Sequence, residues 1–329
     1  MSPPLLAVGD LRTWFYTDQG VARAVDGISF HVDEGETLGI VGESGCGKTV
    51  TSLSVLGLQA PARIMEGSSI VFQGDELVGA SEKRLRAIRG NEISMIFQEP
   101  MSSLNPVFSV GDQIGEALRL HRGMDARSAR VETVRLLEEV GIPAAGDRID
   151  EYPHQLSGGM RQRVMIAMAL SCEPALLIAD EPTTALDVTI QAQILELLAG
   201  LRERHGMAVV LITHDLAVVA EVCDRVVVMY AGQVVESGSV REIFADPKHP
   251  YTRALMDGLP AVGAGRERLV PIPGAVPSPM RWPQGCRFRE RCAQAFAPCT
   301  DVPALVEQGP GRASRCWLHA DAATRDVAP

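Results

Sequence analysis

Gly42-Glu43-Ser44-Gly45-Cys46-Gly47-Lys48-Thr49 is the stretch around which this 329-residue sequence is organised. It satisfies the pattern G-x-x-x-x-G-K-[ST] at every specified position. An apolar run precedes it and indicates a buried strand, and residues 50–58 can form a helix. Because a loop of this kind binds phosphate between a strand and a helix, we expect a nucleotide site here.

The residues of the loop have separate roles in this chemistry. Its glycines let the backbone curl so that N–H groups point at phosphate oxygens, and the helix N-terminus adds partial positive charge. We expect Lys48 to reach the β- and γ-phosphates and Thr49 to offer its hydroxyl to Mg²⁺. The cradle itself is expected from Gly42, Ser44, Gly45, Cys46 and Gly47. The alternative is a glycine-rich turn with a chance lysine.

Composition limits the class of protein. The chain has room for one large α/β domain with an appendage, or for two domains, and 46% of its residues are apolar. A net charge of −10 argues against a broad basic surface for nucleic acid. No apolar run is long enough to span a bilayer, and the N-terminus resembles no signal peptide. We therefore expect a cytoplasmic protein, which could still dock on a membrane partner.

Polar residues follow several of the apolar runs that predict buried strands. Gln98 ends one, Asp180 and Glu181 end another, and His214 ends a third. In a doubly wound parallel sheet, ligands bind at the carboxyl ends of strands. We expect Asp180 to hold Mg²⁺ and Glu181 to polarise the attacking water. Each residue alone has an ordinary alternative, but their convergence favours a nucleotide site.

A helical segment interrupts the strands. Residues 110–165 carry helical periodicity and no strand pattern, which predicts an inserted helical subdomain. Within it, the helix at residues 128–140 is marked by an apolar stripe: Val131, Val134, Leu136 and Leu137. Ser157, followed by Gly158 and Gly159, is placed to cap a later helix and could form a second anion site. An ordinary capped helix is the alternative.

The N-terminal part reads as β-structure with exposed aromatic residues. Residues 5–40 predict several short antiparallel strands. Side chains alternate along a strand, so Trp14, Phe15 and Tyr16 cannot all face the core. One exposed ring could stack on a base, or the strand could simply have an apolar outer face.

Together, the motifs of residues 5–240 resemble those of an ABC-type ATPase: GESGCGKT, the Gln98 loop, LSGGMRQR, LLIADEP, TALD and THD occur in that family's order. The resemblance implies a P-loop NTPase (RecA-like) α/β core that hydrolyses ATP with Mg²⁺. It assigns Lys48, Gln98, Glu181 and His214 to catalysis. It also implies that Thr49, Gln98 and Asp180 bind Mg²⁺.

Other roles are carried over from the same resemblance. Ser157 and Gly159 would act on ATP held by an opposite subunit, Asp187 would lie at the dimer interface, and Tyr16 would stack on adenine, with Phe15 as the alternative. The implied domains are residues 1–98 and 172–240 for the ATP-binding core with an antiparallel β subdomain, 99–171 for the helical signature subdomain, and 241–329 for a C-terminal extension.

A narrower resemblance is to the ATP-binding subunits of dipeptide, oligopeptide and nickel importers. It rests on QEPMSSLNP, HPYTRALM at 249–256, IPGAVPSP at 272–279 and GCRFRERC at 285–292. It implies a paired homologous ATPase, two membrane permeases, an indirect substrate-binding protein and a peripheral place on the cytoplasmic face of the inner or plasma membrane. Nickel-chelate and glutathione importers remain alternatives. A soluble ABC ATPase is disfavoured because the chain has one motif set and no long coiled coil.

Four cysteines lie in the C-terminal extension with the spacing C-x5-C-x6-C-x16-C: Cys286, Cys292, Cys299 and Cys316. Structural zinc sites usually have closer pairs, so spacing leaves a metal site and unligated thiols equally open. Resemblance to the tails of some peptide-importer ATPases implies a [4Fe-4S] cluster, with Zn²⁺ as its rival. Nearby arginines could offset the charge of a cluster: Arg287, Arg289, Arg291 and Arg315.

Overall fold

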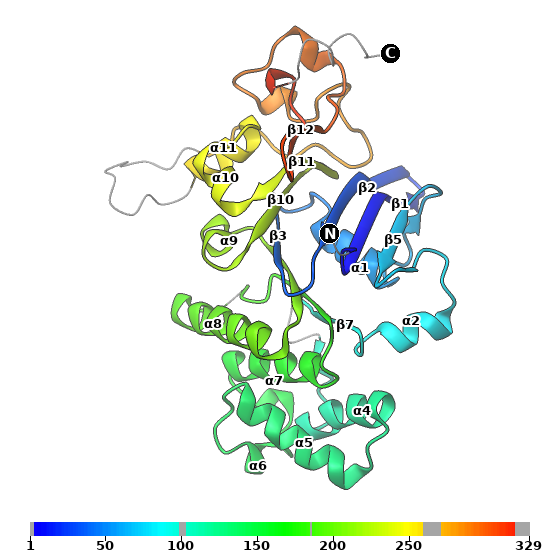
Figure 1. Ribbon diagram of the computed structural model, residues 1–329, viewed down its shortest axis with the longest axis vertical. Coiled ribbons are helices and arrows are strands. Elements are labelled where there is room, and N and C mark those ends of the chain that lie inside the picture. Colours follow the sequence, from blue (N-terminus) through cyan, green and yellow to red (C-terminus); the bar gives the residue numbers. More distant parts are fainter. Residues whose placement is uncertain (1–2, 99–102, 185, 259–270, 320–329) are drawn as a thin grey trace. The chain divides into compact units, whose positions relative to one another are not determined.

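The structure, a computed structural model, divides the chain into two compact units (Figure 1). It describes residues 3–98, 103–184, 186–258 and 271–319. The first unit comprises Met1–Val32, Thr37–Val78 and Thr213–Pro329, and the second comprises Asp33–Glu36 and Gly79–Ile212. Residues 99–102 of the Gln98 loop and Ala185 of the TALD motif lie outside the described residues.

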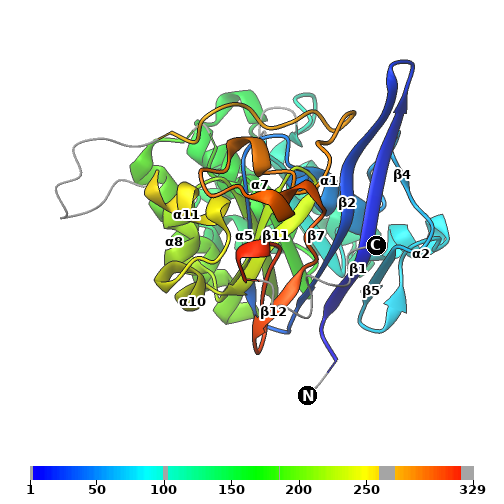
Figure 2. The ribbon, with the colours of Figure 1, turned by 90° about the horizontal axis from the view of Figure 1, so that it is seen from above.

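An antiparallel sheet begins the first unit. Its strands are β1 (Leu6–Thr17), β2 (Gly20–Val32), β4 (Arg63–Ile64), β5 (Ser69–Phe72) and β6 (Asp75–Glu76). The order is β2-β1-β5-β6, with β4 also paired to β1. Figure 2 shows β1 and β2 side by side as one long hairpin. The prediction of several short strands was wrong, because register shifts near Val8 and Leu11 break the apolar alternation without ending the strand.

A second group of strands in the first unit has the order β12-β13-β11-β10-β3. These are β3 (Thr37–Val41), β10 (Arg225–Tyr230), β11 (Gln233–Ser239), β12 (Val306–Gly309) and β13 (Arg312–Ser314). The strands β3 and β10 are parallel, whereas β10, β11, β13 and β12 pair antiparallel in turn. The strands β10 and β11 form a hairpin, and the C-terminal extension continues its sheet.

Short helices complete the first unit. They are α1 (Lys48–Val55), α9 (Leu216–Val222), α10 (Val240–Ala245) and α11 (Pro250–Asp257), with 3-10 turns at Arg289–Arg291, Ala297–Thr300 and Trp317–His319. One buried cluster joins β10 to the C-terminal extension, where Tyr230, Tyr251 and Phe288 meet ring against ring. The extension therefore packs into the core of its unit.

The second unit combines three parallel strands with helices. The strands, in the order β9-β8-β7, are β7 (Ile93–Ile96), β8 (Leu176–Asp180) and β9 (Ala208–Thr213). The helices are α2 (Glu82–Ile88), α4 (Val110–Arg122), α5 (Ala126–Glu139), α6 (Ala145–Arg148), α7 (Gly158–Leu170) and α8 (Val188–His205), with a 3-10 turn at Pro153–Gln155. Residues 110–165 hold helices and no strand, as predicted.

Side-chain caps begin these helices. Ser109 accepts the N–H of Asp112 at 3.1 Å ahead of α4, and Asp125 accepts that of Ser128 at 2.8 Å ahead of α5. The predicted apolar stripe of α5 was right for Leu136 and Leu137, which are buried, and wrong for Val131, which is 68% exposed. The buried positions of α5 follow helical spacing: Ala129, Thr133, Leu136 and Leu137.

Candidate nucleotide-binding site

The phosphate loop connects β3 to α1, as the sequence predicts, and close packing requires two of its glycines. A Cβ atom on Gly42, at φ 154°, would lie 2.2 Å from the carbonyl oxygen of Met229. A Cβ on Gly47, at φ 102°, would lie 2.5 Å from that of Ala24. No L-residue fits either position without moving the backbone.

Lys48 folds back over the loop that precedes it. Its ammonium Nζ donates to the carbonyl oxygens of Gly42 at 2.8 Å and Glu43 at 3.3 Å, and the residue is only 6% exposed. Thr49, on the first turn of α1, is exposed. An ammonium fixed by the backbone beside an exposed hydroxyl provides the two groups that a nucleotide phosphate and its cation require.

The remaining loop residues differ in exposure. Ser44 and Gly45 are exposed, whereas Cys46 is fully buried and burial raises the pKa of its thiol. The carbonyl of Cys46 accepts the N–H of Gly232 at 3.1 Å. Cys46 therefore takes part through its main chain, and its side chain fills the space under the loop.

Of the two candidate aromatic residues near the N-terminus, Tyr16 presents the exposed ring. Its residue is 54% exposed, while Phe15 is half-buried. The guanidinium of Arg63 lies 5.6 Å from the centre of the Tyr16 ring, and the phenol contacts Met65. The exposed aromatic surface that a base could stack on belongs to Tyr16.

In the second unit, the structure brings Gln98 and Glu181 together. Glu181 Oε2 accepts hydrogen bonds from Gln98 Nε2 at 3.0 Å and from the hydroxyl of Thr184 at 2.9 Å. Glu181 has a positive φ of 46°, and its N–H donates to the carbonyl of Ile212 at 2.8 Å. Asp180, the last residue of β8, is buried. A strained backbone held by such bonds fixes the carboxylate direction.

The other predicted site residues lie at the ends of elements. Ser157 is exposed and caps α7 by accepting the N–H of Met160 at 3.4 Å, with Gly158 and Gly159 in the first turn. Asp187 is exposed ahead of α8, and His214 is exposed just after β9. Lys48, Thr49 and His214 belong to the first unit, and the acidic, glutamine and signature residues to the second.

All four C-terminal cysteines line one small pocket, together with Phe288 and Trp317. Their thiols are free, and burial raises the pKa of Cys286, of Cys292 and, to about 11, of Cys316. Within the described residues, no group of three or more His, Cys, Asp or Glu side chains is arranged to hold a metal ion.

Sequence reasoning missed the partners of two arginines beside these cysteines. Arg291 pairs with Glu43 of the phosphate loop, and Arg287 pairs with Asp26. Both charges are thus already matched by carboxylates. The pattern G-x-x-x-x-G-K-[ST] leaves the position of Glu43 unspecified, so no local signal could have revealed the pair.

Comparison with known proteins identifies the family. A family profile described as ABC transporter matches residues 25–184, and one described as the C-terminal region of oligopeptide/dipeptide transporters matches residues 235–299. The dipeptide transport ATP-binding protein DppD of Escherichia coli is 52% identical over 323 residues, which cover 98% of each chain. The chain belongs to the ABC transporter family. The ABC protein is thus an ATPase coupled to transport, as its motifs predicted.

Further relatives agree on the fold and family of this ABC protein. The oligopeptide transport ATP-binding protein AppD of Bacillus subtilis is 51% identical over 96% of this chain and 97% of its own. The dimeric ATP-binding cassette MJ0796, solved with ADP and Pi, has a TM-score of 0.65 and 26% identity over 72% of this chain and 99% of that chain. The expected P-loop NTPase fold is confirmed. Among the described residues, none of the helices has the length and apolar character needed to cross a membrane.

Proposed function

We propose that this ABC protein is the energy-coupling ATPase subunit of an importer of di- or oligopeptides. The observation that carries the proposal is the match of residues 235–299 to the C-terminal region of oligopeptide/dipeptide transporters. The names of relatives about half identical along nearly the whole chain, such as AppD and DppD, support it.

The proposed chemistry gives each site residue one task. Lys48 stabilises charge on the β- and γ-phosphates, and His214 does so on the γ-phosphate. Thr49, Gln98 and Asp180 would hold Mg²⁺, which neutralises phosphate charge when bound. Glu181 accepts a proton from the attacking water, and its bonds from Gln98 and Thr184 support this role by fixing the carboxylate.

Replacing Glu181 tests the proposed base. Glu181→Gln removes the proton acceptor but preserves the side-chain shape, so hydrolysis should fall by about 10²–10⁴-fold while ATP still binds. Glu196→Gln is the matched control, because Glu196 is an exposed acid of α8. Turnover and nucleotide affinity are measured on the same preparations. Undiminished turnover in Glu181→Gln would reject the assignment.

We also propose the assembly in which this subunit works. It pairs with a homologous ATPase on the cytoplasmic face of the membrane, docks on two permeases, and receives cargo indirectly from a substrate-binding protein. Ser157, Gly159 and Asp187 would face the partner ATPase. Uptake of labelled dipeptide, glutathione and nickel chelate by cells carrying wild type or Glu181→Gln tests the cargo. If Glu181→Gln abolishes the uptake of nickel chelate or glutathione but leaves the uptake of dipeptide unchanged, peptide import is contradicted.

For the C-terminal cysteines we propose a [4Fe-4S] cluster, held by Cys286, Cys292, Cys299 and Cys316. Support comes from the gathering of four free thiols at one pocket. A cluster supplies four cation–thiolate bonds, which would offset the cost of ionising buried thiols. Iron, labile sulfide and zinc are measured after anaerobic purification. Stoichiometric zinc without iron contradicts the cluster, and Cys299→Ala should release any bound metal.

A further inference from the structure

Glu43, the second residue of the phosphate loop, is bound to the C-terminal extension through its side chain. Its carboxylate receives two parallel hydrogen bonds from Arg291, Nη1 to Oε2 at 2.6 Å and Nη2 to Oε1 at 2.9 Å. Its main-chain N–H donates to the hydroxyl of Tyr251 at 2.8 Å. A paired fork of charge-assisted bonds fixes both the place and the orientation of a carboxylate.

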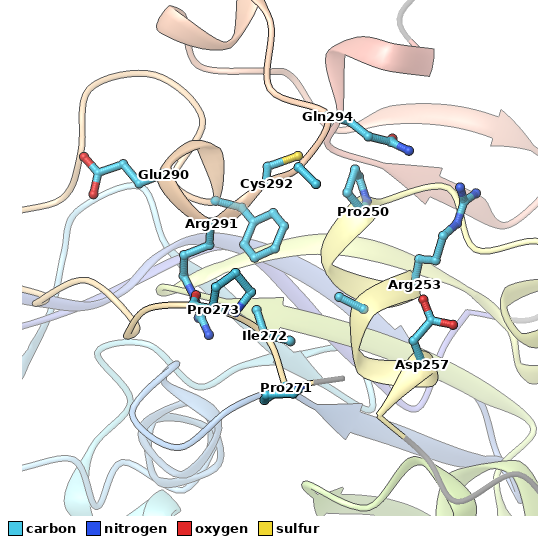
Figure 3. A pocket seen from close by; sticks show the side chains of 13 residues that line it. Pro250, Arg253, Asp257, Pro271, Ile272, Pro273, Glu290, Arg291, Cys292 and Gln294 are labelled. Atoms are coloured by element: carbon cyan, nitrogen blue, oxygen red, sulfur yellow. The ribbon is translucent and has the colours of Figure 1, made fainter. Parts of the chain in front are cut away.

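Arg291 is itself held in one position. Its Nε donates to the carbonyl of Pro273 at 2.8 Å, and Nη1 also contacts the Tyr230 hydroxyl at 3.2 Å. Figure 3 shows the Arg291 side chain running past Pro273 at the wall of a pocket of about 470 Å³. The side chain is only 5% exposed, so water and salt screen the pair with Glu43 weakly.

The same residue of the loop supports the phosphate-binding lysine. The carbonyl oxygens of Gly42 and Glu43 accept the bonds from Lys48 Nζ. A displacement of Glu43 therefore displaces a support of Lys48. In addition, the Glu43 carboxylate is a negative charge within a loop meant for phosphates, and unless it is neutralised it repels an anionic ligand.

We propose that Arg291 is a positioning residue for ATP binding. It neutralises Glu43 and holds the loop main chain on which Lys48 rests. The C-terminal extension thereby sets the affinity of the phosphate loop for nucleotide. This inference rests on the proposed binding of ATP at residues 42–49.

The charges of Glu43 and Arg291 determine whether each substitution should raise the Kd of ATP. In the full-length protein, Arg291→Met leaves the Glu43 carboxylate uncompensated, so the Kd of ATP should rise about tenfold. Glu43→Gln alone should leave the Kd within about twofold. Adding Glu43→Gln to Arg291→Met should restore most of the lost affinity, because the repelling charge is gone. Displacement of trinitrophenyl-ATP measures each Kd.

Control variants separate the role of Arg291 from a general effect of lost positive charge and from an error in the proposed ATP site. Arg289→Met removes a neighbouring charge of the same 3-10 turn and should leave the Kd unchanged. Lys48→Met must weaken binding; if it does not, the proposed ATP site itself is wrong. If Lys48→Met weakens binding but Arg291→Met does not, the role of Arg291 in nucleotide binding is rejected. If Glu43→Gln fails to rescue Arg291→Met, the neutralisation of Glu43 by Arg291 is rejected as the cause.

Thermal denaturation shows whether Arg291→Met folds. If it does not fold, Arg291→Lys is used in its place. Arg291→Lys keeps a positive charge but cannot form the fork, so a roughly threefold rise in Kd is expected. Because this rise comes from the lost fork and not from an unmatched charge, Glu43→Gln should not remove it. Equal affinities in wild type and Arg291→Lys would overturn the positioning role of the fork.

Discussion

At the scale of single residues, the phosphate loop depends on a close approach between backbones. The space that a side chain on Gly42 would need is occupied by the carbonyl of Met229 on β10. Gly45, in contrast, has φ 81° and no atom within 4 Å of its missing Cβ. The two glycines therefore separate the cost of a positive φ from the cost of a clash.

We predict that Gly42→Ala destabilises the protein far more than Gly45→Ala. Gly45→Ala has only left-handed strain to overcome, about 1–2 kcal/mol. Gly42→Ala must also push β10 and the loop apart, which should cost more than about 3 kcal/mol. Chemical denaturation of both variants provides the comparison, and equal losses would show that the loop relaxes freely.

Individual residues also show what the sequence could and could not reveal. Gln98 and Glu181 were predicted as site residues because each ends an apolar run, and the structure joins them by a hydrogen bond. The contact between Glu43 and Arg291 spans 248 residues, and neither position belongs to a periodic pattern. Long-range pairs of this kind depend on the folded chain and leave no trace in local spacing.

At the scale of elements, Glu139 ties the C-terminal end of α5 to that of α8. It accepts a hydrogen bond from His205 at 2.8 Å and pairs with Arg135 at 3.0 Å. Burial raises the pKa of the Glu139 carboxyl, but these hydrogen bonds and charges outweigh burial and hold it below its usual value. Their stabilising contribution is present above the unfolded pKa and is lost as the pH falls through the folded pKa.

We predict that Glu139→Gln lowers the free energy of unfolding by about 1–2 kcal/mol at pH 7. The difference from wild type should be complete above the unfolded pKa of about 4.3 and should shrink as the pH falls below it. Glu138→Gln, an exposed neighbour on the same helix, should change stability by less than about 0.5 kcal/mol. Urea unfolding at several pH values measures both, and a pH-independent loss would contradict the argument.

The boundaries of helices and strands were predictable to within a few residues where capping residues, glycine or proline mark them. The cap at Ser157 and the strand before the phosphate loop lie where the sequence indicates. The face of α5 was not predictable from Val131, because an apolar residue on an exposed face costs little. The long β1–β2 hairpin was obscured by bulges, which disturb the period of two.

At the scale of the whole molecule, nucleotide should raise the melting temperature by mass action. At a free ATP concentration 100 times the Kd, binding adds about 2.7 kcal/mol, which for a chain of this length corresponds to roughly 4 °C. The scan is run with EDTA to prevent hydrolysis. Lys48→Met should abolish the shift whatever its own melting temperature, and a full shift in that variant would contradict the role of Lys48.

The pairing of β11 with β13 protects the protein against self-association. Glu236 and Ser237 of β11 pair with Ser314 and Ala313, residues that come 78 and 76 positions later in the chain. Without the extension, β11 would offer a row of unpaired N–H and C=O groups as a template for another chain. The strands β12 and β13 thus cover the edge of the sheet at β11. A chain that lacks them risks aggregation even when its ATP-binding motifs are complete.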